Sequence, residues 1–133
     1  MIRRIHHINF LVRDLDAALE KYEQLFGRPA DAREFLPDRG VETARFRVGE
    51  TWIVLVMPLD PDSVPGQHLQ REGEGFFLIS YEVDDATAAA QTLARRGIRV
   101  LDDVPRAGLR GWRLIDLDPA DTFDVVSQLT EET

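Results

Sequence analysis

The sequence repeats itself at an offset of 71 residues, and this repeat constrains the fold more than any other feature of the chain. At this offset the stretch 8–18 aligns with 79–89, and each stretch contains an aspartate that can begin a helix. The stretch 51–56 aligns with 122–127 without a gap. An internal duplication explains both matches, so the chain should contain the same supersecondary module twice.

The first copy predicts a strand followed by a helix. Residues 5–12 are rich in β-formers, and Asp14 or Asp16 can cap a helix whose apolar residues keep helical spacing until Gly27. Two further strands are expected at 41–48 and 51–57.

Gly49-Glu50, between those two strands, is a plausible tight hairpin turn. If the region 30–36 supplies one more strand, the module is βαβββ. The fold class is therefore α+β, with two βαβββ modules forming cup-shaped half-barrel sheets.

The second copy predicts the same order of elements. A strand at 76–83 precedes a helix at about 86–96 that stops at Gly97. The remaining strands are expected at 98–102, 112–117 and 123–128.

These boundaries organise residues 1–133 as a single domain. Module one covers about 1–59 and module two about 76–128, and a Pro- and Gly-containing linker at about 60–75 has a possible short helix at 64–71. Residues 129–133 are expected to form a frayed tail.

Composition limits the classes of partner. The formal net charge of −8 argues against a nucleic-acid or anionic membrane surface, because both need concentrated positive charge. The chain has no cysteine, which excludes disulfides and thiolate sites, and no apolar run reaches the roughly 20 residues of a membrane span. We therefore expect a cytoplasmic protein whose partner is a small-molecule ligand.

The order and spacing of several segments resemble the vicinal oxygen chelate superfamily, which includes glyoxalase I, bleomycin-resistance proteins, extradiol dioxygenases and methylmalonyl-CoA epimerase. The epimerase branch is the most similar, through the segments HHINFLVRDLDAALEKY, LPDRGVE, DPDSVPGQHLQREGEG and DDVPRAGLRGWRLIDLDP. The resemblance implies that paired modules complete a cavity. In the enzymes, it implies that four side chains on the cavity floor, two from each module, hold a divalent metal.

Carrying the family's ligand positions over gives an incomplete set. The first position falls on His7, the second on Val54 and the third on Leu78. The fourth falls on Val125 in the gapless register or on Asp124 if one residue is deleted. Because Val and Leu cannot ligate a cation, we expect no metal and no other cofactor, with His7 and Asp124 as remnant ligand candidates.

Other positions bear on a ligand pocket. The basic glutamate of the epimerase branch falls on Thr43, with Glu42 one residue away and expected on the opposite face of its strand. Trp52 and Trp112 could stack on a flat ligand, and Arg110 could contact a phosphate or carboxylate.

His6 is expected to face away from His7, on the opposite side of the strand.

Two functions follow from these residues. The first is a metal-free binding protein that takes up a small hydrophobic or aromatic molecule in a largely apolar cup. The alternative is a glyoxalase- or epimerase-like isomerase or lyase that uses a rearranged divalent metal site. A homodimer is expected in both cases, because cups of this family are often completed between subunits.

Overall fold

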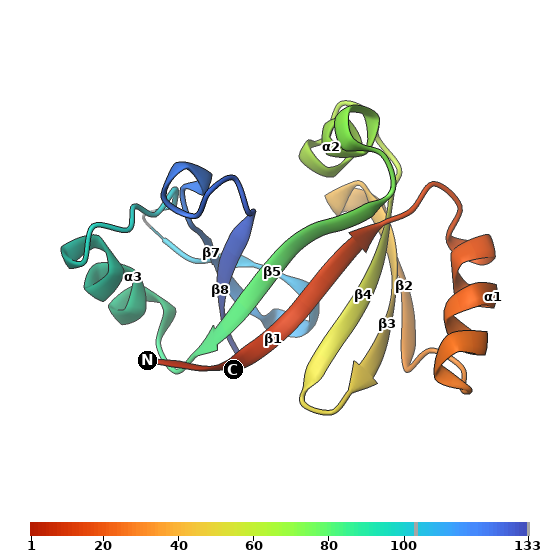
Figure 1. Cartoon of the computed structure of the whole chain (residues 1–133), viewed down its shortest axis with the longest axis horizontal. Helices are drawn as coiled ribbons and strands as arrows, with labels where there is room; N and C mark the ends of the chain where they lie inside the picture. The colour runs from red at the N-terminus through yellow and green to blue at the C-terminus, as the bar shows by residue number, and fades with distance from the viewer. Residues whose placement is uncertain (103, 133) are drawn as a thin grey trace. The chain divides into compact units, whose positions relative to one another are not determined.

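The computed structural model describes residues 1–102 and 104–132. The predicted α+β architecture with two successive βαβββ modules is confirmed (Figure 1). The strands are β1 (Ile2–Leu11), β2 (Ala32–Leu36), β3 (Val41–Val48), β4 (Thr51–Pro58), β5 (Gly75–Val83), β6 (Arg106–Ala107), β7 (Arg113–Asp116) and β8 (Ser127–Glu131). The α-helices are α1 (Leu15–Phe26), α2 (Val64–Glu72) and α3 (Ala86–Arg95). Short 3₁₀ turns lie at Pro37–Arg39, Leu109–Gly111 and Pro119–Asp121.

The chain divides into two compact units, and both divisions fall within the long strands β1 and β5. The first-repeat unit is Ile8–Phe77, and the second-repeat unit is Met1–His7 together with Leu78–Thr133. Each unit has its own hydrophobic core and is described separately below.

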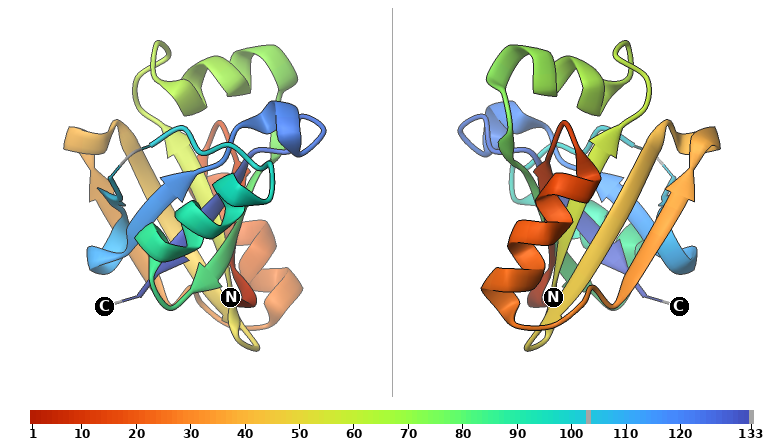
Figure 2. Two further views of the ribbon diagram at one scale, coloured as in Figure 1. Left: turned by 90° about the vertical axis from the view of Figure 1, so that its left-hand side faces the viewer. Right: turned by 90° about the vertical axis from the view of Figure 1, so that its right-hand side faces the viewer.

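In the first-repeat unit the strand order is β2-β3-β4-β1, and α1 packs on one face of the sheet (Figure 2). The helix begins where Asp14 accepts a hydrogen bond from the Ala17 amide at 3.1 Å. It ends at Gly27, whose φ of 71° is the left-handed conformation that favours glycine. Both predicted helix limits are confirmed, because local capping chemistry determines them.

The hairpin between β3 and β4 also follows its local sequence. The strands are antiparallel in the register Val48↔Thr51, which leaves Gly49-Glu50 as the turn, with Gly49 at a φ of 61°. Buried Phe46 and Leu55 pack against α1 from this sheet. The hairpin is therefore fixed by its turn and by its hydrophobic alternation.

The helix expected in the linker is present as α2, which begins at Ser63, where the side chain accepts from the Gly66 amide. Gly66 has no room for a side chain, because an added Cβ would lie 2.2 Å from the Asp60 carbonyl oxygen. No helix in the described part of the chain is long and apolar enough to cross a membrane.

In the second-repeat unit the strand order is β1-β5-β8-β7-β6, and α3 covers one face of the sheet (Figure 2). Asp85 caps α3 by accepting from the Ala88 amide at 3.0 Å. The predicted helix is confirmed, as is the strand expected at 112–117, which is β7.

Three boundary predictions for this unit are wrong. Residues 98–102 form only an isolated bridge, between Val100 and Leu117. The last strand is β8 at 127–131 and not at 123–128, and residues 129–131 of the expected tail belong to it, while residue 133 lies outside the described residues. A turn with positive φ at Phe123 and Asp124 occupies the start of the expected strand, and apolar composition alone does not reveal it.

Candidate functional site

The sheet of the second-repeat unit has one apolar and one polar face. On β5, Val83 packs in the core under α3 and Tyr81 packs against it, while Ser80 and Glu82 point to the other side of the strand. On β8 the pairs Ser80↔Gln128 and Glu82↔Thr130 continue this polar face. The hydroxyls of Ser80 and Thr130 are 2.5 Å apart and both residues are fully buried.

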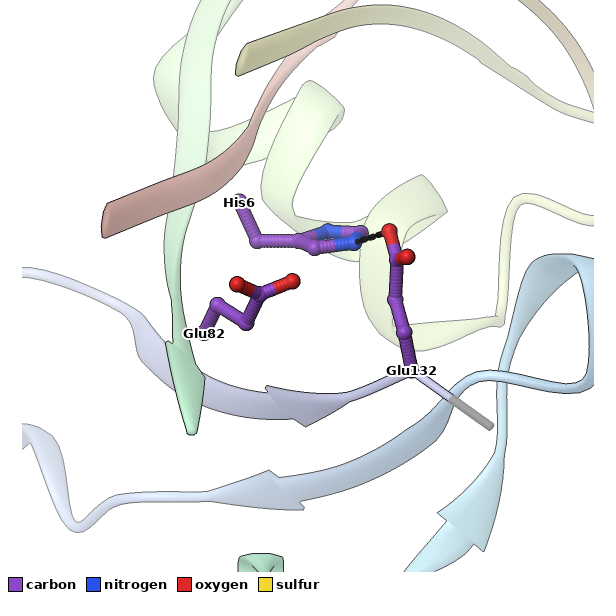
Figure 3. Close-up of side chains that lie close together, drawn as sticks. All are labelled: His6, Glu82 and Glu132. Carbon is purple, nitrogen blue, oxygen red and sulfur yellow. Dashed lines mark hydrogen bonds and ion pairs between the residues drawn. The ribbon is translucent and has the colours of Figure 1, made fainter. Parts of the chain in front are cut away.

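Three metal-ligating side chains meet on this unit: His6 of β1, Glu82 of β5 and Glu132, which follows β8 (Figure 3). One nitrogen or oxygen atom of each lies within 4.8 Å of the others. His6 Nε2 is 2.5 Å from Glu132 Oε1, and the His6 side chain is fully buried. An imidazole nitrogen with two carboxylates is a donor set suited to a divalent transition metal.

A neighbouring cation already interacts with these carboxylates. Arg4 donates from Nε and Nη2 to the two oxygens of Glu82, at 3.0 and 2.9 Å, and its Nη2 lies 3.5 Å from Glu132. These hydrogen bonds hold the pKa of Glu82 below its usual value. The Glu82 carboxylate is therefore available as an anion, although a metal would compete with Arg4 for it.

His6 and His7 do not face opposite sides of the strand, contrary to the expectation from alternation. Their Nδ1 atoms are 2.9 Å apart, and both rings contact Trp112, His6 edge-on and His7 stacked with ring centroids 5.3 Å apart. Both imidazoles thus lie beside one indole.

Burial keeps both imidazoles neutral at pH 7. It lowers the pKa of His7 to about 3, with a smaller lowering from His6. Gln128 lies beside His7 and opposes this shift, although no described residue donates a hydrogen bond to its Oε1. Burial also lowers the pKa of His6, against the opposite effect of Glu132.

Neutral imidazoles define a hydrogen-bond chain. If His6 donates from Nε2 to the Glu132 carboxylate, its Nδ1 must accept, so His7 donates from Nδ1. A cation bound to His6 Nε2 would require the other tautomer, with His6 donating from Nδ1 to His7. In both tautomers His7 orients His6.

The register of the last strand differs from the gapless register that places Val125 opposite Val54 in the repeat. In the first-repeat unit the Val12 amide donates to the Val56 carbonyl, 44 positions along, whereas Ile79 donates to Val126, 47 positions along. The second copy thus has three more residues before its last strand. The position equivalent to Val54 therefore moves to Gln128, and Val125 and Asp124 lie exposed in the preceding turn.

The other predicted pocket residues lie in both units. In the second-repeat unit Trp112 and Leu78 are 5% exposed, and Trp112 is brought against His7. Arg110 is exposed and has a φ of 52° in the turn before β7. In the first-repeat unit Trp52 and Val54 are 9% and 1% exposed.

The sequence analysis did not bring His6, Glu82 and Glu132 together as one group. A signal was present: Gln128, Thr130 and Glu132 alternate with period two, as one face of a strand does. An expected strand that ends at residue 128 separates Gln128 from Thr130 and Glu132, which then fall in the expected tail.

Comparison with known proteins identifies the class to which this fold and site belong. Residues 6–115 match the family described as "Glyoxalase/Bleomycin resistance protein/Dioxygenase superfamily". Since the match covers most of the chain, the protein belongs to this superfamily, and its two curled βαβββ half-barrels are the fold of that class.

The relatives point to one branch of the superfamily. The chain is 34% identical to the ethylmalonyl-CoA/methylmalonyl-CoA epimerase of Cereibacter sphaeroides, over 91% of this chain and 92% of that protein. It is 31% identical to the human mitochondrial methylmalonyl-CoA epimerase, over 96% of this chain and 73% of that protein. A structure of the Streptomyces coelicolor epimerase with 2-nitronate-propionyl-CoA superposes with a TM-score of 0.92, at 32% identity over 100% and 96% of the two chains. The protein is therefore related to the methylmalonyl-CoA epimerases.

Proposed function

We propose that this protein is an epimerase- or glyoxalase-like isomerase or lyase that moves a proton at the carbon next to a carbonyl, with a divalent metal held at a rearranged site. The proposal is carried by the His6, Glu82 and Glu132 group, whose donor atoms lie within 4.8 Å of one another. The relatedness to epimerases supports the reaction class.

The residues fit a cation by their chemistry and burial. His6 would supply an imidazole nitrogen oriented by His7, and Glu82 and Glu132 would supply carboxylate oxygens. When bound, the cation would act as a Lewis acid that stabilises negative charge on a substrate oxygen. The 2.5 Å separation of His6 Nε2 and Glu132 Oε1 must widen to admit it, because metal–nitrogen and metal–oxygen bonds are each about 2.0–2.2 Å.

Proton transfer must use a different group from that of the epimerase branch. The equivalent position is Thr43, a buried hydroxyl that is not basic at neutral pH. His7 is a weak base, because its pKa is about 3. Glu132 exposes 41% of its side chain and is the carboxylate of the group most accessible to a substrate, so we assign it the proton-accepting role.

The substrate class follows from the relatives named above. We propose a 2-substituted malonyl-type thioester as the first substrate to test, because its acidic α-carbon lies between two carbonyl groups. Such a substrate also has a carboxylate that a basic side chain can recognise.

The experiment combines metal binding with isotope exchange. Chelator-treated protein is titrated calorimetrically with Co²⁺, Zn²⁺, Ni²⁺ and Mn²⁺, and methylmalonyl-CoA is then incubated with the loaded protein in D₂O. We expect stoichiometric binding and α-deuteration, both lost in Glu82→Gln and retained in Asp84→Asn, whose carboxylate pairs with Arg3 at the surface. Absence of both metal binding and exchange in the wild type would reject the proposal.

A second candidate, metal-free binding of a small hydrophobic or aromatic molecule, is favoured by Val54 and Leu78. These positions correspond to metal ligands in the resembled family, yet they hold buried aliphatic side chains. A thermal-shift screen of aromatic compounds on chelator-treated protein tests this function. Stabilisation that is unchanged by added metal, in a protein without exchange activity, would favour it over the enzyme.

A further inference from the structure

The face of β3 and β4 opposite α1 carries a buried cation. Ala44, Phe46 and Leu55 pack in the core of the first-repeat unit, so strand alternation directs Arg45 to the other face. Arg45 pairs directly with Val54 across the two strands. Its side chain is 6% exposed, which is unusual for a charged residue without full compensation.

The polar contacts of Arg45 leave one donor unsatisfied. Nη1 donates to a carboxylate oxygen of Glu34. Glu34 lies on the neighbouring strand β2, where it pairs with Thr43 of β3. The guanidinium carbon lies 5.1 Å from the centroid of the Trp52 ring. Nε of Arg45 is buried and has no hydrogen-bond acceptor among the described residues.

A buried donor without an acceptor is costly. Leaving such a group unsatisfied costs about 1–3 kcal/mol, and more when the group is charged, so native proteins usually give it a partner. Glu34 exposes 30% of its side chain and meets the guanidinium through Nη1, so it does not compensate Nε. The free Nε–H is therefore suited to an acceptor brought by a ligand.

We propose that Arg45 forms a binding subsite for the carboxylate of a small organic acid. A guanidinium is planar, permanently charged and matched to carboxylate geometry, which distinguishes this ligand from a neutral molecule. The overall charge of −8 repels small anions, so a fixed cation at the site would offset that repulsion.

The subsite rests on the proposed function only for its class of ligand, because a malonyl-type substrate carries a free carboxylate. It lies wholly within the first-repeat unit, apart in sequence from the residues proposed to hold the metal. Its binding can therefore be measured without metal and without turnover.

Malonate is the first probe, with malonamide as its neutral counterpart. Calorimetric titration of chelator-treated protein at fixed ionic strength should show binding of malonate and no binding of malonamide. Arg45→Met should weaken malonate binding by about tenfold or more, because the charge-assisted hydrogen bonds are lost. Arg33→Met is the matched control, since Arg33 lies on β2 with a side chain that is 41% exposed and paired with Asp16 and Glu42.

Glu34→Gln gives the sharper test, because its effect has the opposite sign. Removing the competing carboxylate should tighten malonate binding several-fold, a gain that a purely structural Arg45 would not produce. If Arg45→Met fails to fold, Arg45→Lys keeps the charge, and it should still lose most of the affinity because it has no Nε donor.

The source of the carboxylate is resolved by a second arm with malonyl-CoA. If malonyl-CoA binds more tightly than malonate and this binding is lost in Arg45→Met, the ligand is an acyl-CoA. If malonyl-CoA and malonate bind with equal affinity, the ligand is a free acid. The proposal is overturned if the wild type binds neither probe, if Arg45→Met binds malonate as the control does, or if Glu34→Gln gives no gain. Failure of metal binding or α-deuteration would leave these results unchanged, so the two proposals can fail separately.

Discussion

The two repeats present differently charged faces on the side of the sheet away from their helices. The second-repeat unit carries buried hydroxyls and the carboxylate of Glu82, whereas the corresponding face of the first-repeat unit carries buried Val54 and the guanidinium of Arg45. Duplication supplied the same backbone twice, and alternation directs the substituted residues of each copy to one face. The same backbone can therefore carry a different set of charged side chains in each copy.

The largest expected contrast between the units is in their acid sensitivity. The pKa of His7 is lowered from 6.5 to about 3, so the unfolded chain binds a proton that the native state excludes. Stability is therefore fully present above pH 6.5 and is lost progressively as the pH falls toward 3, by on the order of 5 kcal/mol in total. Burial also lowers the pKa of His6, so His6 contributes to acid sensitivity in the same direction.

Urea unfolding of chelator-treated protein between pH 7.5 and 4.5 measures this effect. In the wild type, the free energy of unfolding should fall by up to about 1.4 kcal/mol per pH unit because of His7. This contribution to the pH dependence should be absent from the His7→Gln variant. Hydrogen exchange should show the amides of β5 and β8 losing protection on acidification before those of β3 and β4. Equal loss in both units would break the proposed contrast.

A smaller effect is expected from the paired charges on β1 and β5. Arg4 and Glu82 have side chains that are 18% and 16% exposed, and they share two hydrogen bonds. Glu82→Gln should lower the free energy of unfolding by about 2 kcal/mol, less than for a fully buried pair because water still reaches both groups.

The control is the neighbouring exposed pair of Arg3 and Asp84, with side chains that are 60% and 77% exposed. Asp84→Asn should leave the urea midpoint unchanged, because exposed pairs contribute little. If both variants shift the midpoint equally, burial of the Arg4–Glu82 pair does not set its strength.

Local chemistry allowed much of the fold to be predicted. The limits of α1 follow from the Asp14 cap and from Gly27, and the β3–β4 hairpin follows from Gly49. Each of these signals lies within a few residues of the element that it determines, so no tertiary information is needed.

The candidate site could not be predicted in the same way. His6 and Glu132 are 126 residues apart, and their contact depends on the register of β8, which three additional residues displace from the repeat. The contact between His6 and His7, whose Nδ1 atoms are 2.9 Å apart, is not what strict strand alternation predicts. A strict period-two interpretation therefore separates two rings that the fold brings together.

The smallest expected effects are in the turns that precede the last strand of each repeat. Gly49 adopts a φ of 61° and Phe123 a φ of 56°, so this conformation is held by glycine in one copy and, in the other, by a bulky aromatic residue that rarely adopts it. Phe123 is 95% exposed and its side chain has little packing to lose. Phe123→Asn should therefore raise the free energy of unfolding by about 0.5–1 kcal/mol, because asparagine tolerates the left-handed region better.

Gly49→Ala should instead lower the free energy of unfolding, since a Cβ there meets no atom within 4 Å and conformational strain is the main change. Urea midpoints measure both changes, and shifts of the same sign would show that the two turns are not equivalent.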